Sequence, residues 1–290
     1  KDLSVSRINK NWGIKTPIDD NHTIYVWFDA LINYYSATRT KDKEKYWPPD
    51  VHLIGKGINW FHSVIWPGML FSAEIKQPKK VLVHGYLTVN GKKIGKSLGN
   101  VIDPIHLIEK YGSDSLRYFL VREIKFMEDG DFSEEALKSR INNELANDLG
   151  NLISRVLTIC EKNFDGKIKH HSIDKNLESQ LNLKKVEELM ESYNLTEALN
   201  EIWSFVKSCN KHINDNKIWE LSGEKQEAHL YNLLEGIRIS NLLLSPFIPG
   251  TSENISKQIG VNSNNIRETK FGLTKEYTVK KSEILFQKIK

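Results

Sequence analysis

Two lysines on a glycine-containing loop have the charge and spacing to neutralise a polyphosphate. Residues 81–104 read VLVHGYLTVNGKKIGKSLGNVIDP, in which an apolar run leads to the tight-turn pair Asn90-Gly91. Lys93, Lys96 and Ser97 follow this pair. Ammonium groups on such a loop can stabilise the charge that grows on a departing pyrophosphate in a transition state. A solvated basic hairpin tip has the same composition, so the spacing alone leaves both interpretations open.

A second set of residues has the composition of an apolar binding pocket. Trp27, Ala30 and Tyr34 lie three and four positions apart. A helix that begins near Asp29 would place Ala30 and Tyr34 on one face, at the strand end where open α/β sheets bind ligands. Aromatic rings around a small alanine suit a flexible thioether, because sulfur–aromatic contacts are favourable. The alternative is an ordinary hydrophobic core, where such residues are common.

A third set has the side chains that read nucleic-acid bases. Asn143, Asn147, Asn151 and Arg155 repeat every fourth position along a long predicted helix. Asn and Arg bind base edges by paired hydrogen bonds, and RNA loops expose unstacked bases for such contacts. Trp219 could supply the aromatic surface on which a base stacks. A solvated polar helix face and a tryptophan in the core are the alternative interpretation.

These residues depend on two kinds of predicted structure, which meet near residue 130. Residues 25–28, 52–55 and 81–85 are short apolar runs that end at turns, and we predict buried strands there. Helical spacing lies between them, for example over residues 60–73. Strands that alternate with helices indicate an α/β fold with parallel strands, so we predict an α/β unit over residues 1–132.

From Ser133 onward the apolar positions follow the period of amphipathic helices. Ser133 is a good N-cap, and Glu134 and Glu135 follow in the first turn, where the helix dipole favours acids. Further helices are predicted around residues 181–190, 196–212 and 224–244, so residues 133–290 should form an α-helical bundle. Residues 270–290 are basic and β-like around residues 277–279, and we predict a peripheral tail there.

The composition is that of a globular protein without a disulfide framework. The chain has 290 residues and a formal net charge of +4, which permits nucleic acid as a partner without requiring it. Cys160 and Cys209 form no Cys-x-x-Cys pair, so we expect a reducing, cytoplasmic location and no protein-held metal. No apolar run reaches membrane-spanning length, so we expect no membrane partner, and the N-terminus lacks the apolar segment of a signal peptide.

The lysine loop resembles the Lys-Met-Ser-Lys-Ser signature of class I aminoacyl-tRNA synthetases. Here the segment reads Lys93-Ile94-Gly95-Lys96-Ser97, and its flanks, residues 84–91 and 98–104, are similar to the methionyl enzyme in particular. The resemblance implies that Lys93 and Lys96 are catalytic and that Lys93, Lys96 and Ser97 bind ATP, which enters with Mg²⁺ as a substrate. It also implies L-methionine and tRNA(Met) as partners.

The same resemblance assigns roles to the aromatic set. Residues 25–34 are similar to the methionine-pocket segment of this family, so Trp27, Ala30 and Tyr34 would line the substrate. Residues 52–62 resemble the next family signature, in which the position of His62 lies near the methionine sulfur.

The polar set gains a role from the resemblance as well. Asn151-Leu152-Ile153-Ser154-Arg155 resembles the anticodon motif Asn-Leu-x-x-Arg, so Asn151 and Arg155 would bind the anticodon, and Trp219 would stack on it. The implied fold is the second half of a Rossmann-like class I catalytic domain over residues 1–132. An all-α anticodon-binding domain over residues 133–290 would follow.

Three positions depart from the family pattern. Gly95 replaces the first serine of the loop signature, and Gly57 stands where the family carries an acidic residue that holds the adenylate. Ile218 stands where the family has proline before the tryptophan, and His-Ile-Gly-His occurs nowhere in the sequence. We therefore expect a fragment of a methionine–tRNA ligase that is inactive in isolation, with a half sheet that exposes apolar faces.

Two alternatives to this expectation stay open. A non-catalytic tRNA-binding module, or a decayed synthetase paralogue, would fit Gly57 and Gly95. Another class I synthetase, of the leucyl or cysteinyl type, would share the lysine loop. The pocket set and the anticodon set both favour the methionyl enzyme over this last alternative.

Overall fold

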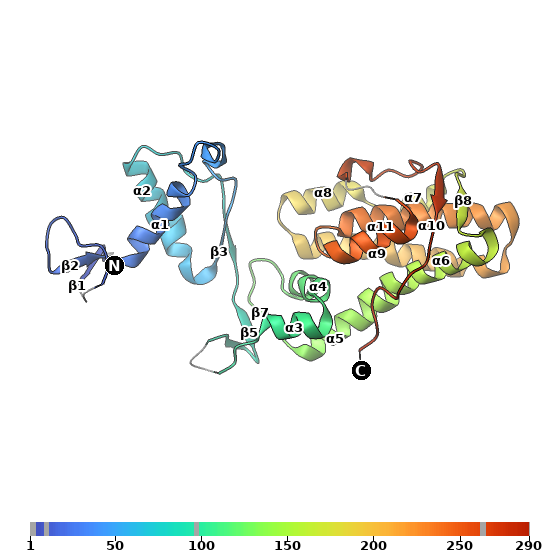
Figure 1. Cartoon of the computed structure of the whole chain (residues 1–290), viewed down its shortest axis with the longest axis horizontal. Coiled ribbons are helices and arrows are strands. Elements are labelled where there is room, and N and C mark those ends of the chain that lie inside the picture. The colour runs from blue at the N-terminus through green and yellow to red at the C-terminus, as the bar shows by residue number, and fades with distance from the viewer. Residues whose placement is uncertain (1–3, 9–11, 96–98, 262–264, 290) are drawn as a thin grey trace. The chain divides into compact units, whose positions relative to one another are not determined.

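The computed structural model describes residues 4–8, 12–95, 99–261 and 265–289. The chain divides into two compact units, residues 1–86 and residues 87–290 (Figure 1). We call them the N-terminal unit and the helical unit, and each is described by itself. The predicted functional division at residues 132 and 133 is a different boundary, and it stays a prediction.

The described residues of the N-terminal unit form two small sheets and two α-helices. Strands β1 (Ser6–Ile8) and β2 (His22–Ile24) pair antiparallel, whereas β3 (His52–Gly55) and β4 (Val81–His84) pair parallel. The helices are α1 (Val26–Ser36) and α2 (Trp66–Ser72), with a π-helical turn at Phe61–Ile65 and 3₁₀ turns at Glu44–Tyr46 and Lys56–Ile58. The predicted strands at residues 52–55 and 81–85, their parallel pairing and the helical segment at residues 60–73 are confirmed.

The strand predicted at residues 25–28 is wrong. Helix α1 begins at Val26 instead, and the preceding strand β2 ends at Ile24. A four-residue apolar run carries no periodicity that separates strand from helix. Asp29 lies in the first turn of α1, where an acidic side chain favours a helix N-terminus. The helix therefore begins three residues earlier than the sequence predicted, and it includes Trp27.

The core of the N-terminal unit is small, and its buried residues come from helices α1 and α2. Leu31, Trp66 and Leu70 are buried together, and aromatic side chains from α1 and the π-helical turn pack against them. Leu53 of β3 is 63% exposed and Phe71 is 78% exposed. Parallel strands are usually covered on both faces, so the exposed Leu53 agrees with the predicted exposure of apolar surface, whereas Phe71 belongs to helix α2.

The helical unit begins with a three-stranded sheet and two short helices. Strands β5 (Leu87–Val89), β6 (Lys92–Lys93) and β7 (Gly130–Asp131) have the spatial order β6-β5-β7. Helices α3 (Pro104–Tyr111) and α4 (Ser113–Glu123) lie between β6 and β7 in the sequence. Asp103 caps α3 by accepting from the Ile105 backbone N–H, and Pro104 fills the first helical position.

One long helix follows the sheet, in three consecutive segments. These are α5 (Glu134–Arg140), a π-helical stretch (Ile141–Gly150) and α6 (Asn151–Phe164). Ser133 caps α5 through a hydrogen bond from the Ala136 backbone N–H, so the predicted helix start is confirmed. The π-helical stretch was not predicted, because hydrophobic spacing does not reveal a local change in helical pitch.

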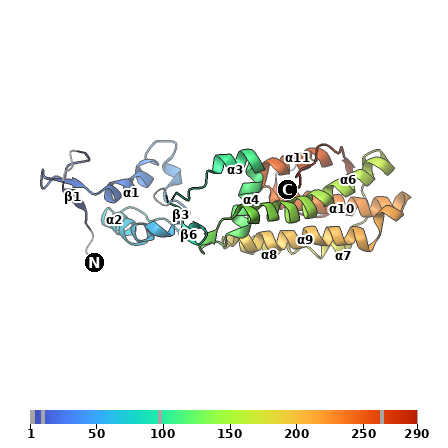
Figure 2. The ribbon, with the colours of Figure 1, turned by 90° about the horizontal axis from the view of Figure 1, so that it is seen from below.

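The remaining helices form the predicted bundle. They are α7 (Lys175–Glu178), α8 (Leu183–Glu191), α9 (Leu195–Asp215), α10 (Gly223–Leu244) and α11 (Pro249–Ile259), with 3₁₀ turns at Ile218–Glu220 and Ile266–Glu268. Helix α10 packs against α6, α9 and α11 (Figure 2). Its side chains are buried over nearly its whole length, so α10 is the centre of the core. No helix among the described residues has the length and apolar character needed to cross a membrane.

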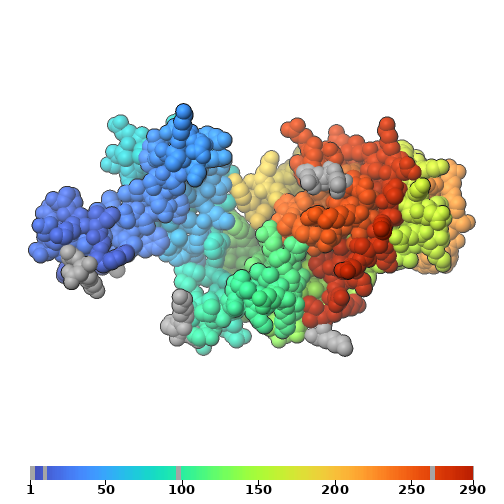
Figure 3. Space-filling view, viewed as in Figure 1, coloured from blue at the N-terminus to red at the C-terminus, as the bar shows by residue number. Residues whose placement is uncertain are grey.

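The prediction of a peripheral tail at residues 270–290 is wrong. Strand β9 (Glu276–Thr278) pairs antiparallel with β8 (Lys167–Lys169), and Tyr277 is fully buried. The segment after β9, in red in Figure 3, lies on the helices of this unit. The β character of residues 277–279 was predicted correctly, but its buried partners lie too far away in the sequence for local patterning to reveal them.

Candidate functional site

A buried histidine organises the aromatic side chains of the N-terminal unit. His62 is fully buried on the π-helical turn, and its Nδ1 lies 3.0 Å from the Ile58 carbonyl oxygen. The carbonyl can only accept, so Nδ1 carries the hydrogen. The Tyr34 hydroxyl lies 2.9 Å from Nε2 and donates to it when the ring is neutral. His62 is thus held at both ring nitrogens, which fixes its orientation.

Trp27 completes this aromatic cluster, which we define as Trp27, Tyr34, Phe61 and His62. The Trp27 ring stacks on Phe61, with centroids 5.1 Å apart, and meets His62 edge-on at 6.4 Å. Ala30 is half-buried on α1, between Trp27 and Tyr34. The structure therefore brings Trp27, Tyr34 and His62 together from two segments and places Ala30 on the same helix.

Two further residues hold Tyr34, and the sequence analysis missed both. The His52 ring lies 4.6 Å from the Tyr34 ring, and the Trp66 indole N–H donates to His52 Nε2 at 3.3 Å. Burial lowers the pKa of His52, and the neighbouring His62 lowers it further, so His52 stays neutral near pH 7. The available signal was a histidine at an inward-facing position of a strand, because Ile54 on the same face is also buried.

Gly57, which departs from the family pattern that the sequence resembles, lies beside Tyr86. A Cβ atom at position 57 would lie 2.8 Å from the hydroxyl oxygen of Tyr86. Real Cβ atoms do not approach other atoms so closely, so a larger side chain here would require the end of the Tyr86 side chain to move. The end of a flexible side chain moves at little cost, so the structure does not exclude an acidic residue at this position.

The hydrogen bond between Tyr34 and His62 can be tested by removing one hydroxyl. Tyr34→Phe leaves the buried Nε2 of His62 without its donor, which we expect to destabilise the protein by about 1–3 kcal/mol. Urea unfolding measures the change. Tyr35→Phe is the matched control, because the Tyr35 hydroxyl makes no hydrogen bond to any described residue. Equal stability of the two variants would contradict this account.

The lysine loop starts from a tightly held hairpin. Asn90 and Gly91 both have positive φ, 53° and 69°, which is the conformation of a two-residue hairpin turn between β5 and β6. Asp131 of β7 accepts from the Thr88 hydroxyl at 2.6 Å and from the Gly91 backbone N–H at 2.9 Å. These hydrogen bonds keep the pKa of Asp131 below its usual value. The predicted turn is confirmed, and it is anchored to the neighbouring strand.

Asn100 joins the two ends of the lysine loop, which we define as residues 92–99. Its side-chain NH₂ donates to the Lys93 carbonyl at 3.2 Å, and its Oδ1 accepts from the Gly95 backbone N–H at 3.0 Å. Lys93 is exposed at the end of β6. Lys96 and Ser97 lie outside the described residues. The sequence analysis gave Asn100 no role, although a side-chain amide with one donor and one acceptor suits loop closure.

Arg155 and Trp219 lie together on the surface of the helical unit. The guanidinium carbon of Arg155 is 5.8 Å from the centre of the Trp219 ring, and Arg155 Nη2 donates to Asn214 Oδ1 at 2.8 Å. Trp219 is 51% exposed, so its assignment to the core is excluded. The two side chains line an open cavity of about 450 Å³, which we call the tryptophan pocket, with Ser154, Thr158 and Ile159. Asn214 was missed by the sequence analysis, because it comes from the end of a different helix.

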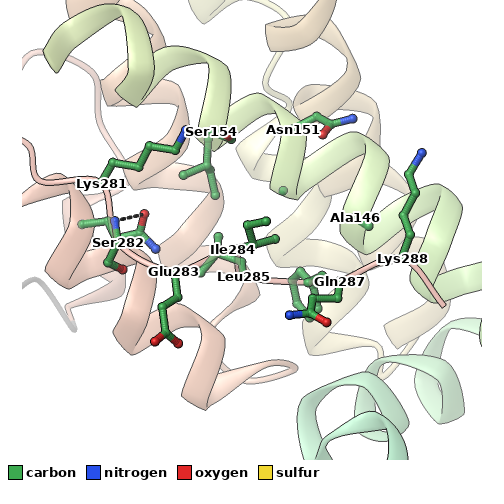
Figure 4. A pocket seen from close by; sticks show the side chains of 14 residues that line it. Ala146, Asn151, Ser154, Lys281, Ser282, Glu283, Ile284, Leu285, Gln287 and Lys288 are labelled. Atoms are coloured by element: carbon green, nitrogen blue, oxygen red, sulfur yellow. Dashed lines mark hydrogen bonds between the residues drawn. The ribbon is translucent and has the colours of Figure 1, made fainter. Parts of the chain in front are cut away.

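Asn151 lies one helical turn before Arg155 and is exposed. Its amide is 3.5 Å from that of Asn147, so these two members of the predicted polar stripe are neighbours. Asn151 also borders a second cavity, between α6 and residues 281–288, and its side chain points away from that C-terminal segment (Figure 4). Its polar atoms are therefore available on the face of the helix that leads to Arg155.

The parallel strands, the lysine loop and the helical bundle are the parts of a class I tRNA synthetase with an anticodon-binding domain. Residues 1–157 match the family of tRNA synthetases class I (M). Residues 174–289 match the anticodon-binding domain of tRNA ligases. The match of more than half of the chain shows that it belongs to the class I (M) family of tRNA synthetases.

Named relatives agree with this assignment. The chain is 46% identical over 308 residues to the methionine–tRNA ligase of Caldanaerobacter subterraneus, and 45% identical over 306 residues to that of Thermotoga maritima. All of this chain is covered in both cases, but only 48% and 49% of the relatives. The chain thus spans about half the length of the curated relatives it matches.

A solved structure is similar to the whole chain. The methionyl-tRNA synthetase of Mycobacterium tuberculosis in complex with methionyl-adenylate has a TM-score of 0.90 and 34% identity. The comparison covers 99% of this chain and 60% of that one. The predicted fold, second half of a class I catalytic domain followed by a helical anticodon-binding domain, is confirmed.

Proposed function

We propose that this chain supplies the C-terminal portion of a methionine–tRNA ligase. In the proposed reaction, the methionine carboxylate attacks the α-phosphate of ATP, methionyl-adenylate forms, and pyrophosphate leaves. The methionyl group then passes to the terminal ribose of tRNA(Met), and AMP leaves. The observation that carries the proposal is the cluster of Trp27, Tyr34 and buried His62 in a chain of the class I (M) family. The methionyl-adenylate bound by the similar M. tuberculosis protein supports it.

The aromatic cluster would bind the methionine side chain. The Trp27 and Tyr34 rings and Ala30 offer apolar surface, and a thioether gains favourable contacts at aromatic rings. His62 is held by Ile58 and Tyr34, so it would present a fixed ring near the sulfur. No covalent intermediate with the protein is required, because positioning and charge stabilisation can supply the rate enhancement.

The lysine loop would act on the triphosphate. Lys93 and Lys96 would stabilise the charge on the leaving pyrophosphate, and Ser97 would bind ATP through its hydroxyl. Mg²⁺ would accompany ATP as part of the substrate. The hydrogen bonds between Asn100 and the backbone of Lys93 and Gly95 support this role, because they hold the backbone at Lys93 in place. The proposed location of the reaction is the cytoplasm. The proposed catalytic portion is residues 1–132, and the proposed anticodon-binding portion is residues 133–290.

Methionine-dependent exchange of pyrophosphate with ATP is the direct test of this proposal. The measurement uses the longest polypeptide that contains this sequence, because the relatives are about twice as long. Exchange that requires methionine and that leucine or cysteine does not replace is the expected result. A folded polypeptide that binds tRNA(Met) without any exchange would overturn the enzymatic proposal.

The anticodon assignment predicts a loss of tRNA affinity from one substitution. Trp219→Ala should weaken binding of the tRNA(Met) anticodon stem-loop by about 1–3 kcal/mol, roughly 5- to 150-fold, because a stacked base loses its platform. Fluorescence anisotropy with the 290-residue chain measures this. Trp12→Ala is the control, since Trp12 is 84% exposed in the N-terminal unit. Equal affinity of wild type and Trp219→Ala would show that Trp219 does not bind the anticodon.

A second candidate function is a tRNA-binding module without catalysis. The observation that favours it is Gly57, which offers no carboxylate at the position where the resemblance implies an acidic residue. In this case, anticodon binding would persist and depend on Arg155 and Trp219, while pyrophosphate exchange would be absent. The exchange assay therefore separates the two functions.

A further inference from the structure

Three potential metal ligands converge at one end of the helical bundle. Asp174 precedes α7, His212 lies in the last turn of α9, and His229 lies in α10. One ligand atom from each residue lies within 4.8 Å of the other two. His212 Nε2 is 2.9 Å from His229 Nδ1, and His212 Nδ1 is 3.9 Å from Asp174 Oδ2. All three side chains are half-buried, so the cluster is shielded but reachable from solvent.

Asp174 is held so that one carboxylate oxygen faces the histidines. Its Oδ1 accepts from the backbone N–H groups of Asn176 and Leu177 as the N-cap of α7. Asn232 of α10 accepts from the Asp174 backbone N–H and donates to the Ser172 carbonyl. These contacts leave Oδ2 on the side of His212. Fixed outer contacts of this kind orient the ligands of metal sites.

We propose that Asp174, His212 and His229 bind a divalent transition-metal ion of the zinc class. Two imidazoles and one carboxylate, with a fourth position for water, are a donor set that Zn²⁺ accepts. Zinc–ligand bonds of about 2.0–2.2 Å place the ligand atoms of a tetrahedral site roughly 3.3–3.6 Å apart. The three candidate ligand atoms lie within 4.8 Å of one another. His212 faces His229 with Nε2 and Asp174 with Nδ1, so only one of these two nitrogens can bind the ion. Binding therefore requires the His212 ring to turn so that one nitrogen faces both His229 and Asp174, and the ion replaces the contact between the two rings.

The position of the cluster gives the ion a structural consequence. His212 and His229 flank the connection between α9 and α10, which carries Trp219. A bound ion joins the start of α7, the end of α9 and the first turns of α10. It therefore fixes the two ends of the connection that carries Trp219. The sequence predicted no protein-held metal because these ligands are far apart along the chain and form no spaced motif.

Titration with Co²⁺ and Zn²⁺ tests this site on the 290-residue protein. Co²⁺ in a site with few ligands absorbs visible light far more strongly than hydrated octahedral Co²⁺, so its spectrum reports the geometry. We expect one such ion per chain, displaced by Zn²⁺. His212→Gln and Asp174→Asn should each weaken binding at least about tenfold. Asp174→Asn retains an oxygen that can cap α7, which keeps the fold intact.

Two further variants make the outcome decisive. His106→Gln removes an exposed histidine of α3 and should leave Co²⁺ affinity unchanged. His171→Gln removes the histidine that pairs with Glu227 near the cluster and should also have no effect. Absence of the strong absorption in wild type, or its loss in His171→Gln but not in His212→Gln, would overturn the proposal. Zn²⁺ should raise the urea midpoint of wild type but not that of Asp174→Asn.

Discussion

Replacing Lys93 and Lys96 together with alanine should slow methionyl-adenylate formation by about 10²-fold or more in the complete polypeptide. The expected loss rests on the proposed function. Removing one fixed donor from a developing charge costs this much in well-studied active sites, and the variant removes two cations. The hairpin anchored by Asp131 and the loop ends joined by Asn100 make the loop a supported element. Single-turnover formation of the adenylate measures the effect.

Lys92→Ala is the matched control for this result. Lys92 neighbours Lys93 on β6, and successive side chains of a strand point to opposite faces. The same charge is therefore removed from the same strand but from its other side. We expect a change of less than about threefold in the adenylate rate, since exposed charges interact weakly through water. Equal losses in Lys92→Ala and Lys93→Ala would mean that the loop acts through net charge alone.

Local chemistry in the sequence predicted most of the elements. Ser133 has a side chain that satisfies a free backbone N–H group, so the helix start there was predicted correctly. Asn90-Gly91 suits a turn with two positive φ angles, so the hairpin was predicted as well. Each of these features is decided within a few residues, which is the range over which sequence patterns carry information.

The errors arose where distant contacts decide the structure. Residues 25–28 are apolar enough for either a strand or a helix, and packing of Trp27 on Phe61 and of Leu31 with Trp66 favours the helix. Tyr277 is buried because Glu235 of α10 accepts its hydroxyl hydrogen, and that partner is 42 positions away. Spacing within residues 270–290 contains no trace of this partner, so the segment was predicted to be peripheral.

The candidate sites show the same limit. Trp27, Tyr34 and His62 were assigned through a resemblance to a family, and the structure brings them together. The residues that position functional side chains were not predicted. Asn214, which holds Arg155, has a partner 59 positions away, so its role follows only from the tertiary structure.

The buried ion pair of α10 should contribute strongly to the stability of the helical unit. Glu235 and Arg238 are 0% and 3% exposed, and two hydrogen bonds of 3.0 Å and 2.8 Å join them. Glu235 also accepts from the Tyr277 hydroxyl at 2.5 Å and from the Gly272 backbone N–H at 2.7 Å. The Glu235 carboxylate therefore holds residues 272–277, which lie before and within β9, against the central helix α10.

Glu235→Ala should lower the free energy of unfolding by about 3–5 kcal/mol, because it leaves the Arg238 guanidinium buried without its counter-charge. Burial alone raises the pKa of Glu235, but hydrogen bonds from Arg238 and Tyr277 outweigh it and hold the pKa below its usual value. A lowered folded-state pKa stabilises the protein above the ordinary pKa, and this contribution is lost as the pH falls through the folded-state pKa. The difference between wild type and Glu235→Ala should therefore shrink on acidification.

Urea unfolding followed by circular dichroism, at pH 7 and at several acidic values, measures both the size and the pH dependence. Glu253→Ala provides the control, because Glu253 forms an exposed pair with Lys257 on α11 at 2.7 Å. Solvent screens that pair, so its removal should cost less than about 1 kcal/mol. A loss of similar size in the two variants would show that burial does not increase the contribution of the Glu235–Arg238 pair to stability. A pH-independent difference would instead assign the loss to packing, since only the ionised carboxylate can lose its pairing on protonation.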